Sequence, residues 1–511
     1  MAASLEALTL NRFGFGPRPG DVAAMSGNLN GWLQNQLAGP QGDSDKTTWS
    51  LSQSKLQISY TRQADGVAVS ENRTLNYLNA TQAQLFPLTS SKNYPDYAER
   101  IRPAVEVQGA SFVRAVMSEY QVREALTMFW HNHFSVNAFA DEFVGASFPV
   151  YDRILRANAL GNFRVMLGQV TKSVTMMYYL NQQSSTSQHP NENFAREVME
   201  LHTLGIINYY GRSGSSAQGY TDDDVIALAR VLTGWTIATG SVNASDGTRP
   251  NDGRFIFAPT FHDKAPKTLL GLSFDGTTGQ AEGEAVLDTL ANHPGTAKFL
   301  ALKLCRYFVA DNPPDILVQT IANVWQANVN APDQIAQVVI AIINSPEFAG
   351  SAGSKVKDPF QLIVSGLRAT QAPWTLNMNY IYAVQNMGYP LFSWPTPDGI
   401  PTDGSTWNGT EGMLQRWNTA ISLFTNTAYT NNQVAALVPS PITDATSLAD
   451  YMARAYLPYG ISDTSRAALR ALAINSSLFA NPVSASTGSD KQTRFGLMIA
   501  ATLCLPEFQV T

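Results

Sequence analysis

The sequence is poor in charged residues and has no long apolar segment. Asp, Glu, Lys and Arg make up 14% of its 511 residues, whereas about 25% is usual for a soluble protein. Ser, Thr, Asn, Gln and Gly stand in their place, an exchange that is more common in extracytoplasmic proteins than in cytosolic ones. No apolar run approaches the roughly 20 residues of a transmembrane helix, so we expect no membrane span.

The charge balance and the missing motifs argue against several classes of function. The formal net charge is −6 and no basic stripe runs along the chain, which argues against binding to nucleic acid or to an anionic membrane. The sequence has no glycine-rich nucleotide loop, and no Gly-x-Ser-x-Gly elbow in a strand-turn-helix context. Kinase and serine hydrolase functions therefore have no motif to support them.

Cysteine is nearly absent. The two cysteines, Cys305 and Cys504, each lie in an apolar segment with helical periodicity. Two buried free thiols are therefore expected, and a disulfide between them is the alternative. Two cysteines alone cannot form a zinc cage.

Helical periodicity is present along most of the chain. It predicts a mainly α fold, a large multi-helix globular protein that forms either one compact body or two lobes. Residues 1–390 are expected to form the main helical domain and residues 391–511 a C-terminal helical subdomain packed on it, because the proline-rich stretch 394–401 cannot continue a helix. Helices are predicted within residues 101–117, 121–130, 151–160, 163–180, 190–205, 221–235, 279–290, 296–308, 316–329, 334–344, 358–368, 411–424, 449–455, 465–471 and 494–503.

A small β-hairpin is also predicted. Residues 254–257 and 268–272 are apolar and prone to form strands, and the turn-forming residues 259–266 lie between them. Residues 40–55 and 62–75 are polar and rich in turn-forming residues, so they are predicted to be surface loops.

Two of the six histidines form a His-x-His pair, His131 and His133. On an extended backbone both rings would lie on one side, whereas on a helix two such residues are about 200° apart and face away from each other. The pair follows a predicted helix. It is therefore either a pair of metal ligands or one capping imidazole and one packed imidazole.

A second polar cluster lies on the helix that Pro190 begins. Glu197 and Glu200 share one polar face with Asn193, and Arg196 is placed to pair with Glu200 at i,i+4. Three interpretations stay open. The stripe is a solvated face with a salt bridge, a buried ion pair, or a set of inward carboxylates as in metal-binding helical bundles.

Three further features carry polar side chains. His202 falls near the edge of the apolar face of the same helix, away from Glu200, so the motif is not that of a His-Glu-x-x-His zinc protease. The three acids at 222–224 follow Thr221 and suit the start of a helix, with a hard cation site as the alternative. His262 and Asp263 are expected either to act together at a metal or to form a hairpin loop.

The leading hypothesis is a metal-dependent enzyme, a hydrolase whose imidazoles and carboxylates converge between helices. Such ligands suit a divalent metal, namely zinc, iron or manganese. An open ligand position would activate water, with a spare carboxylate as base. The expected metal ligands are His131, His133, Glu197 and His262. The expected catalytic residues are Glu197, Glu200, Arg196 and Asp263.

Two other classes of function stay open. One is a non-catalytic extracytoplasmic scaffold or partner-binding protein, whose polar clusters fix the packing of the helices. The other is a haem or copper redox protein, an interpretation that rests on the aromatic-flanked histidines alone. No oligomeric state is predicted.

Several motifs resemble a bacterial family of proteins of unknown function, the domain-of-unknown-function family 1800. The resemblance spans nearly the whole chain and implies an exported protein, periplasmic or extracellular, with a sulfatase-like or phosphatase-like partner encoded nearby. It supplies no catalytic residues. No leader is visible in the sequence, so a cytoplasmic location is the alternative. The motifs include residues 10–21 (LNRFGFGPRPGD), 130–134 (WHNHF), 191–205, 229–235 (ARVLTGW), 262–263 and 397–399.

Overall fold

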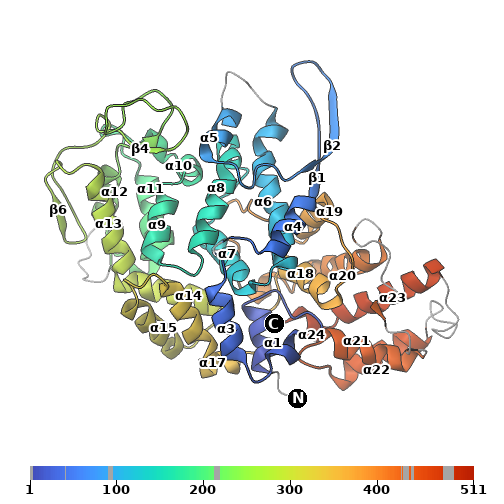
Figure 1. The fold of residues 1–511 in the computed structure, drawn as a ribbon. Coiled ribbons are helices and arrows are strands. Elements are labelled where there is room, and N and C mark those ends of the chain that lie inside the picture. Colours follow the sequence, from blue (N-terminus) through green and yellow to red (C-terminus); the bar gives the residue numbers. More distant parts are fainter. Residues whose placement is uncertain are drawn as a thin grey trace.

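The protein is mainly α, as predicted, and its described residues also form three small antiparallel hairpins (Figure 1). The computed structural model describes residues 4–40, 42–89, 96–211, 219–426, 429, 437–438, 442, 444–475 and 488–511. Within these residues, no helix is both long enough and apolar enough to cross a membrane.

Three long helices form the centre of the molecule (Figure 1): α6 (Tyr97–Met117), α7 (Gln121–Phe134) and α8 (Glu142–Asn158). Every residue of α7 except Asn132 is buried. α7 therefore packs on all sides and is held rigidly, and it carries the His-Asn-His motif at its C-terminal end.

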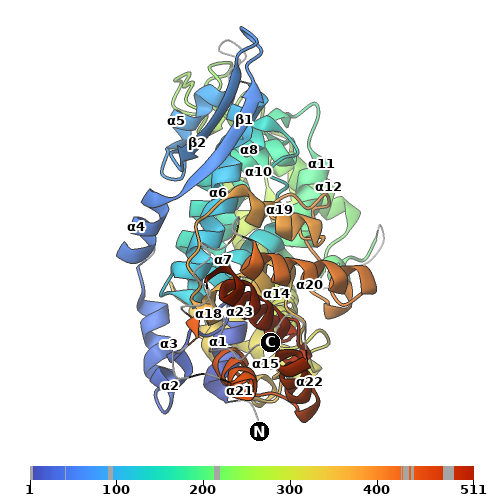
Figure 2. The same cartoon turned by 90° about the vertical axis from the view of Figure 1, so that its right-hand side faces the viewer.

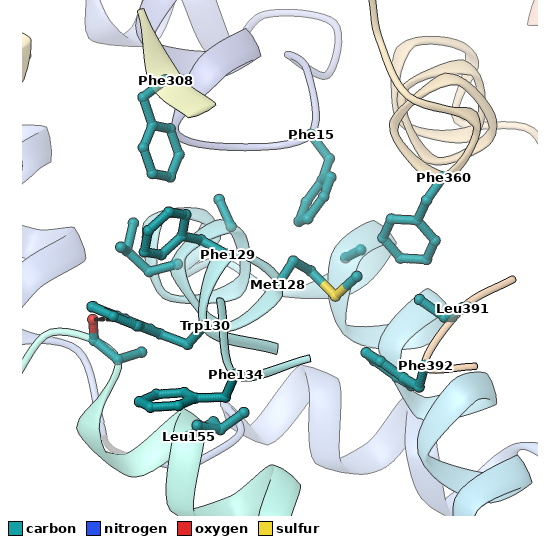
Figure 3. Packing of buried hydrophobic residues seen from close by; sticks show 14 of the residues in the cluster. Phe15, Met128, Phe129, Trp130, Phe134, Leu155, Phe308, Phe360, Leu391 and Phe392 are labelled. Atoms are coloured by element: carbon teal, nitrogen blue, oxygen red, sulfur yellow. Dashed lines mark hydrogen bonds between the residues drawn. The ribbon is translucent and has the colours of Figure 1, made fainter. Parts of the chain in front are cut away.

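Aromatic side chains surround α7 in the core (Figure 3). The rings of Phe129 and Trp130 pack edge to face with their centroids 4.9 Å apart. Phe129 also lies against Phe308, and the indole nitrogen of Trp130 donates to the carbonyl of Ala159 at 3.1 Å. The indole is thus buried with its one donor satisfied, as a buried Trp requires.

The remaining helices surround this centre. Those before α6 are α1 (Leu5–Arg12), α2 (Asp21–Met25), α3 (Leu29–Ala38), α4 (Asp45–Gln53), α5 (Gln82–Leu85) and the 3₁₀ turn η1 (Phe86–Thr89). Those from α8 to α19 are α9 (Phe163–Thr171), α10 (Val174–Tyr179), the 3₁₀ turn η2 (Gln182–Ser184), α11 (Glu192–Glu197), the π-helical segment η3 (Val198–Thr203), the 3₁₀ turn η4 (Ile206–Asn208), α12 (Asp222–Val231), α13 (Gln280–Asn292), α14 (Pro294–Phe308), α15 (Asp315–Ala327), α16 (Gln334–Ile343), α17 (Pro346–Ala349), α18 (Pro359–Thr370) and α19 (Met378–Asn386). Those after α19 are the 3₁₀ turn η5 (Gly404–Thr406), α20 (Thr410–Thr425), α21 (Ala445–Tyr456), α22 (Asp463–Asn475), α23 (Gly488–Leu503) and α24 (Pro506–Gln509).

One predicted helix is in fact two. The helix expected over residues 163–180 is divided into α9 and α10, because the hydroxyl of Ser173 accepts from the backbone N–H of Met176 at 3.2 Å and begins a new helix. A serine in this position satisfies one of the free N–H groups of a helix start.

The predicted hairpin between residues 254–257 and 268–272 is wrong. β4 (Phe255–Phe257) pairs with β3 (Trp235–Ile237), and β5 (Lys267–Leu269) pairs with β6 (Leu272–Phe274). The segment taken as one strand is a hairpin itself. Leu270 and Gly271 both have positive φ, 50° and 78°, as a two-residue hairpin turn requires.

Residues 40–55 and 62–75 are also not simple surface loops. Ser44 caps α4, and β1 (Lys55–Thr61) pairs with β2 (Ala68–Thr74) over its whole length. This hairpin stands out at one end of the molecule, with α21 and α22 at the other (Figures 1 and 2).

The start and the end of the described chain meet at a buried arginine. Arg12, in α1, donates from its guanidinium to the carbonyls of Val309 at 2.7 Å, Ser351 at 2.8 Å and Thr511 at 2.8 Å. The residue is 3% exposed, so these carbonyls replace the water that would otherwise solvate its charge.

One buried cluster contains apolar side chains from Leu8 to Phe508. It draws on both segments of the expected division at residue 390, which stays a prediction. Cys305 and Cys504 are both free, as predicted; Cys305 is buried and Cys504 half-buried. Burial raises the pKa of each thiol to about 12, which makes both weak nucleophiles.

Candidate functional site

The two longest polar motifs of the sequence are in direct contact. Nε2 of His133, near the end of α7, donates to the carbonyl oxygen of His202 in η3 at 3.2 Å. The ring of His202 packs edge to face on Phe134, with the centroids 5.1 Å apart. The end of α7 and the helix that follows Asn191 therefore form one unit, although 69 positions separate the two histidines.

The His-x-His pair does not point into one place. Both residues are helical, so their side chains leave α7 on opposite sides. Nε2 of His131 donates to the carboxylate of Asp152 at 3.0 Å, and its ring lies 4.3 Å from that of Phe392. His131 thus faces α8 and the segment around residue 392, while His133 faces η3.

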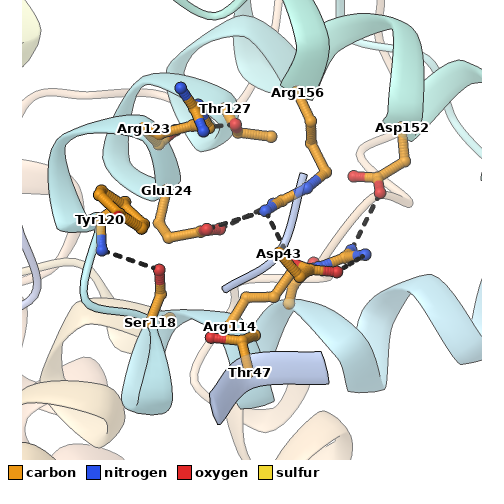
Figure 4. A network of polar contacts seen from close by, with 12 residues as sticks. Asp43, Thr47, Arg114, Ser118, Tyr120, Arg123, Glu124, Thr127, Asp152 and Arg156 are labelled. Atoms are coloured by element: carbon orange, nitrogen blue, oxygen red, sulfur yellow. Dashed lines mark hydrogen bonds and ion pairs between the residues drawn. The ribbon is translucent and has the colours of Figure 1, made fainter. Parts of the chain in front are cut away.

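Asp152 belongs to a buried network of ions (Figure 4). Arg114 bridges Asp152 at 3.0 Å and Asp43 at 2.9 Å, and Arg156 binds Glu124 at 2.7 Å and Asp43 at 3.2 Å. Burial acts to raise the pKa of Asp152, but Arg114 and His131 outweigh it and lower that pKa. The network holds α6, α7 and α8 together, and His131 is part of it.

His133 and His202 are held in the neutral state. Burial lowers the pKa of His202 to about 3, and the nearby ammonium of Lys303 adds to the effect. Burial and the charge of Lys303 also lower the pKa of His133, whose Nδ1 accepts no hydrogen bond from any described residue. Lys303 lies on α14; burial lowers its pKa to about 8, and the charge of Asp398 opposes that shift.

A π-helical segment shapes the second motif. After Glu197 the backbone widens into η3, where the N–H of Gly205 donates to the carbonyl of Met199 at 3.1 Å. π-helical turns are rare and occur often at functional sites. Gly205 ends the segment with φ 83°, as predicted for a helix end, and the ring of Phe299 would lie 2.5 Å from any Cβ there.

Glu197 is the carboxyl group with the most altered environment in this unit. It is half-buried, at the junction between α11 and η3. Burial raises its pKa to about 7, and the negative charges of Glu200 and Asp398 act in the same direction against Arg196. This carboxyl group therefore changes its protonation near neutral pH.

Arg196 does not make the expected pair with Glu200. Its guanidinium donates to Asp222, at the start of α12, at 3.1 Å, and Tyr209 donates to the same carboxylate at 2.9 Å. The acids that follow Thr221 thus serve the helix start and bind Arg196. The predicted capping box at Thr221 is confirmed.

Asp398 reaches the unit through the proline-rich loop 394–401. Asn132, between the two histidines, donates to the carbonyl of Ile400 at 2.9 Å and accepts from its N–H at 2.6 Å. Ser135 donates to the carbonyl of Thr396 at 3.1 Å. The end of α7 therefore fixes the loop from both sides of Asp398.

Two tyrosines complete the surroundings of the carboxylates. Tyr220 is buried and its hydroxyl has no hydrogen-bond partner among the described residues. Burial raises its pKa, and the charges of Glu200 and Glu197 contribute. The pKa of Tyr179 is likewise raised by burial and by the charges of Glu197 and Asp398. Sequence reasoning assigned no chemistry to Asn132, Lys303, Tyr179, Tyr220 or Asp398, although the family motifs at 130–134 and 397–399 contain Asn132 and Asp398.

His262 and Asp263 have other partners. Nδ1 of His262 donates to the carbonyl of Thr233 at 2.8 Å, and its Nε2 lies 3.4 Å from a carboxylate oxygen of Glu282. Asp263 binds Nε of Arg230 at 2.7 Å. In the part of the chain that the structure describes, neither residue contacts Glu197 or the histidines of α7.

The expected metal ligands are thus distributed over several environments. His131 binds Asp152, His133 binds the backbone of η3, and His262 lies beside Glu282. Across residues 4–511, outside the undescribed gaps, no group of three or more His, Cys, Asp or Glu side chains is placed to hold a metal ion. The structure does place Glu197 near enough to Glu200 and Asp398 for their negative charges to raise its pKa.

Comparison with known proteins identifies the family of this chain and gives no further information about its function. No curated protein and no solved structure matches the chain. A family model described as "Protein of unknown function (DUF1800)" matches residues 8–510, nearly the whole chain. The resemblance inferred from the motifs is thereby confirmed, and the chain belongs to the DUF1800 family.

Proposed function

We propose that this protein is a hydrolase in which Glu197 is the general acid–base group. The observation that carries the proposal is the half-buried position of Glu197 near the carboxylates of Glu200 and Asp398, an environment that raises its pKa to about 7. A group that transfers protons is most effective when its pKa lies near the working pH. Pairs of acids whose environments separate their pKa values are typical of active sites.

The surrounding side chains suit this role. In its protonated form Glu197 would donate to the leaving group, and in its ionised form it would take a proton from water. The charges of Glu200 and Asp398 would stabilise positive charge that develops at the substrate. The buried hydroxyl of Tyr220 has no hydrogen-bond partner among the described residues and would donate to a substrate oxygen placed beside it.

We also propose that the protein acts outside the cytoplasm and that its proton transfer does not need a bound metal ion. The low content of charged residues, 14%, supports a place of action outside the cytoplasm. Proton transfer is assigned to Glu197 itself, because the described residues offer no set of three ligands for zinc, iron or manganese. Metal analysis of protein purified without a polyhistidine tag should find well below one ion per chain. An absorption spectrum should show no haem or copper band.

The central experiment compares Glu197→Gln with Glu192→Gln, a matched change at an exposed position on the same helix. Nitrophenyl esters, nitrophenyl glycosides and a nitrophenyl phosphodiester form the substrate panel. We expect Glu197→Gln to lower kcat at least about 100-fold, as for loss of a general acid–base, and Glu192→Gln to retain activity. The inflection of kcat/KM near pH 7 should disappear with Glu197.

A second measurement needs no substrate. A difference titration of the wild type against Glu197→Gln should show one proton lost with a midpoint near pH 7. The proposal is overturned if Glu197→Gln keeps both activity and the pH inflection. It is also overturned if no proton near pH 7 is missing and no substrate in the panel is cleaved; that result would favour a scaffold or partner-binding role.

A further inference from the structure

A cavity lies at the junction of the first turn of the chain with α18, α21 and α24, and neither Glu197 nor the acids near it line this cavity. It encloses about 460 Å³ and is lined by the turn at residues 16–20, α2, α18, the end of α21 and α24. A space of this size lies in the range of small-molecule sites. The Asn-Arg-Phe-Gly-Phe-Gly-Pro motif of the sequence contributes part of its wall.

Lys357 is the unusual residue of this cavity. It is 3% exposed, and its ammonium lies 3.6 Å from the ring centroid of Phe508. Among the described residues no carboxylate lies within ion-pair distance of it, although its side chain lines the cavity. An enclosed lysine without an acid partner is costly, because its charge has lost water and gained no anion.

The other charged residues of the cavity do not supply the negative charge that Lys357 lacks. Arg18 and Arg454 line the same space, whereas Glu6 is the one acidic residue among the described lining residues. Arg18 is anchored to the carbonyls of Val116 at 2.7 Å and Met117 at 3.0 Å. The cavity therefore has an excess of positive charge and a place for an anion.

The surroundings of Lys357 disfavour its charged form. Burial lowers its pKa well below the ordinary value, and the guanidinium of Arg416 on α20 acts in the same direction. Lys355, two residues away, differs because it pairs with Asp311. Lys357 is thus the buried lysine of this segment that lacks a counter-ion.

We propose that this cavity binds a small monocarboxylate with an apolar body. Its carboxylate would pair with Nζ of Lys357, and its apolar part would lie against Phe508, Tyr456 and the prolines of the 16–20 turn. A carboxylate is favoured over a phosphate because the ammonium sits on an aromatic ring in a mainly apolar wall. One short charged contact with an apolar pocket beyond it suits an amphiphilic acid.

Isothermal titration with octanoate and octanamide tests the charge requirement, because the two probes share one chain length. Lys357→Met removes the ammonium and keeps the length of the side chain. Lys46→Met is the control, since Lys46 lines a neighbouring cavity of about 420 Å³ but not the cavity of Lys357. We expect octanoate to bind the wild type and Lys46→Met alike, and Lys357→Met at least about tenfold more weakly. Octanamide should bind the wild type about as weakly as octanoate binds Lys357→Met.

A second pair of variants guards against misfolding as the cause. Ala23 is exposed and lines the cavity, whereas its neighbour Ala24 is exposed and does not. Ala23→Trp should abolish octanoate binding and Ala24→Trp should preserve it, with unfolding midpoints of both near that of the wild type. The proposal is overturned if octanoate binds no more tightly than octanamide, or binds Lys357→Met and Ala23→Trp as it binds the wild type.

Discussion

Nε2 of His133 lies 3.2 Å from the carbonyl oxygen of His202 and joins the end of α7 to the π-helical segment. Both rings are buried and neutral, so the contact is a hydrogen bond between an imidazole and the backbone rather than an ion pair. The role of this pair is to fix η3, and with it Glu197, against the almost fully buried helix α7.

Acid should weaken the fold through these two histidines. Their pKa values are lowered by folding, to about 3 for His202, so the unfolded chain binds more protons below pH 6.5 and stability falls as pH falls. His202 should cost about 2 kcal/mol between pH 7.5 and pH 5, and His133 should act in the same direction. His133→Phe should be less stable than the wild type at pH 7.5 but lose less on acidification. Urea unfolding at the two pH values measures this, with exposed His189→Phe as a control that keeps the wild-type difference.

Glu197→Gln should stabilise the protein at alkaline pH. The folded pKa of about 7 lies above the ordinary value of 4.5, so the stability that the protonated group contributes is lost as pH rises through 7. Above pH 8 the variant should gain on the order of 1–2 kcal/mol, after allowance for solvent screening of this half-exposed group. Below pH 4.5 the gain should vanish. Equal stability of variant and wild type at pH 8.5 would contradict the raised pKa.

Asn132→Ala should release the loop that carries Asp398. Two hydrogen bonds to Ile400 are lost, at a cost of about 1–3 kcal/mol, and the pKa of Glu197 should fall below 7 as the charge of Asp398 recedes. Asp398→Asn separates the two effects, because it removes the charge at an exposed position. It should lower the pKa of Glu197 and leave stability within about 0.5 kcal/mol. Difference titration and urea unfolding measure both.

Gly205→Ala tests the end of the π-helical segment. The residue has φ 83° and ψ 151°, a region open essentially to glycine alone, and a Cβ would lie 2.5 Å from the ring of Phe299. We expect a loss of about 2–4 kcal/mol from strain and overpacking. Gly27→Ala is the matched control, since Gly27 has φ 74° and open space around it. A similar loss in both variants would show that the contact with Phe299 contributes nothing.

The periodic parts of the sequence were predictable, and the irregular parts were not. Helix positions such as that of α7 follow from local apolar spacing, and the capping box at Thr221 follows from its own residues. The π-helical turn after Glu197 has no local signature, so a regular helical wheel could not place His202 in the core. The turn at Leu270 and Gly271 was hidden inside an apolar run because a leucine with positive φ is uncommon.

In the candidate site, too, the features set by local spacing were predictable and the contacts set by tertiary packing were not. Spacing on a helix correctly indicated that His131 and His133 would face apart if the segment were helical, but it could not choose their partners. Asp398 approaches Glu197 from 201 positions later in the chain, and such a contact depends on tertiary packing alone. Nothing in the sequence around Asn132 indicated that its side chain would bind Ile400 and, with Ser135, hold the loop of Asp398.

The cage of carbonyls around Arg12 has a consequence for synthesis on the ribosome. The guanidinium leaves the exit tunnel early, whereas its acceptors at Val309 and Thr511 are translated 297 and 499 positions later. Until then water must solvate the charge, and the first helix cannot settle into its native surroundings. The contacts of Arg12 can therefore be completed only after Thr511 has been synthesised.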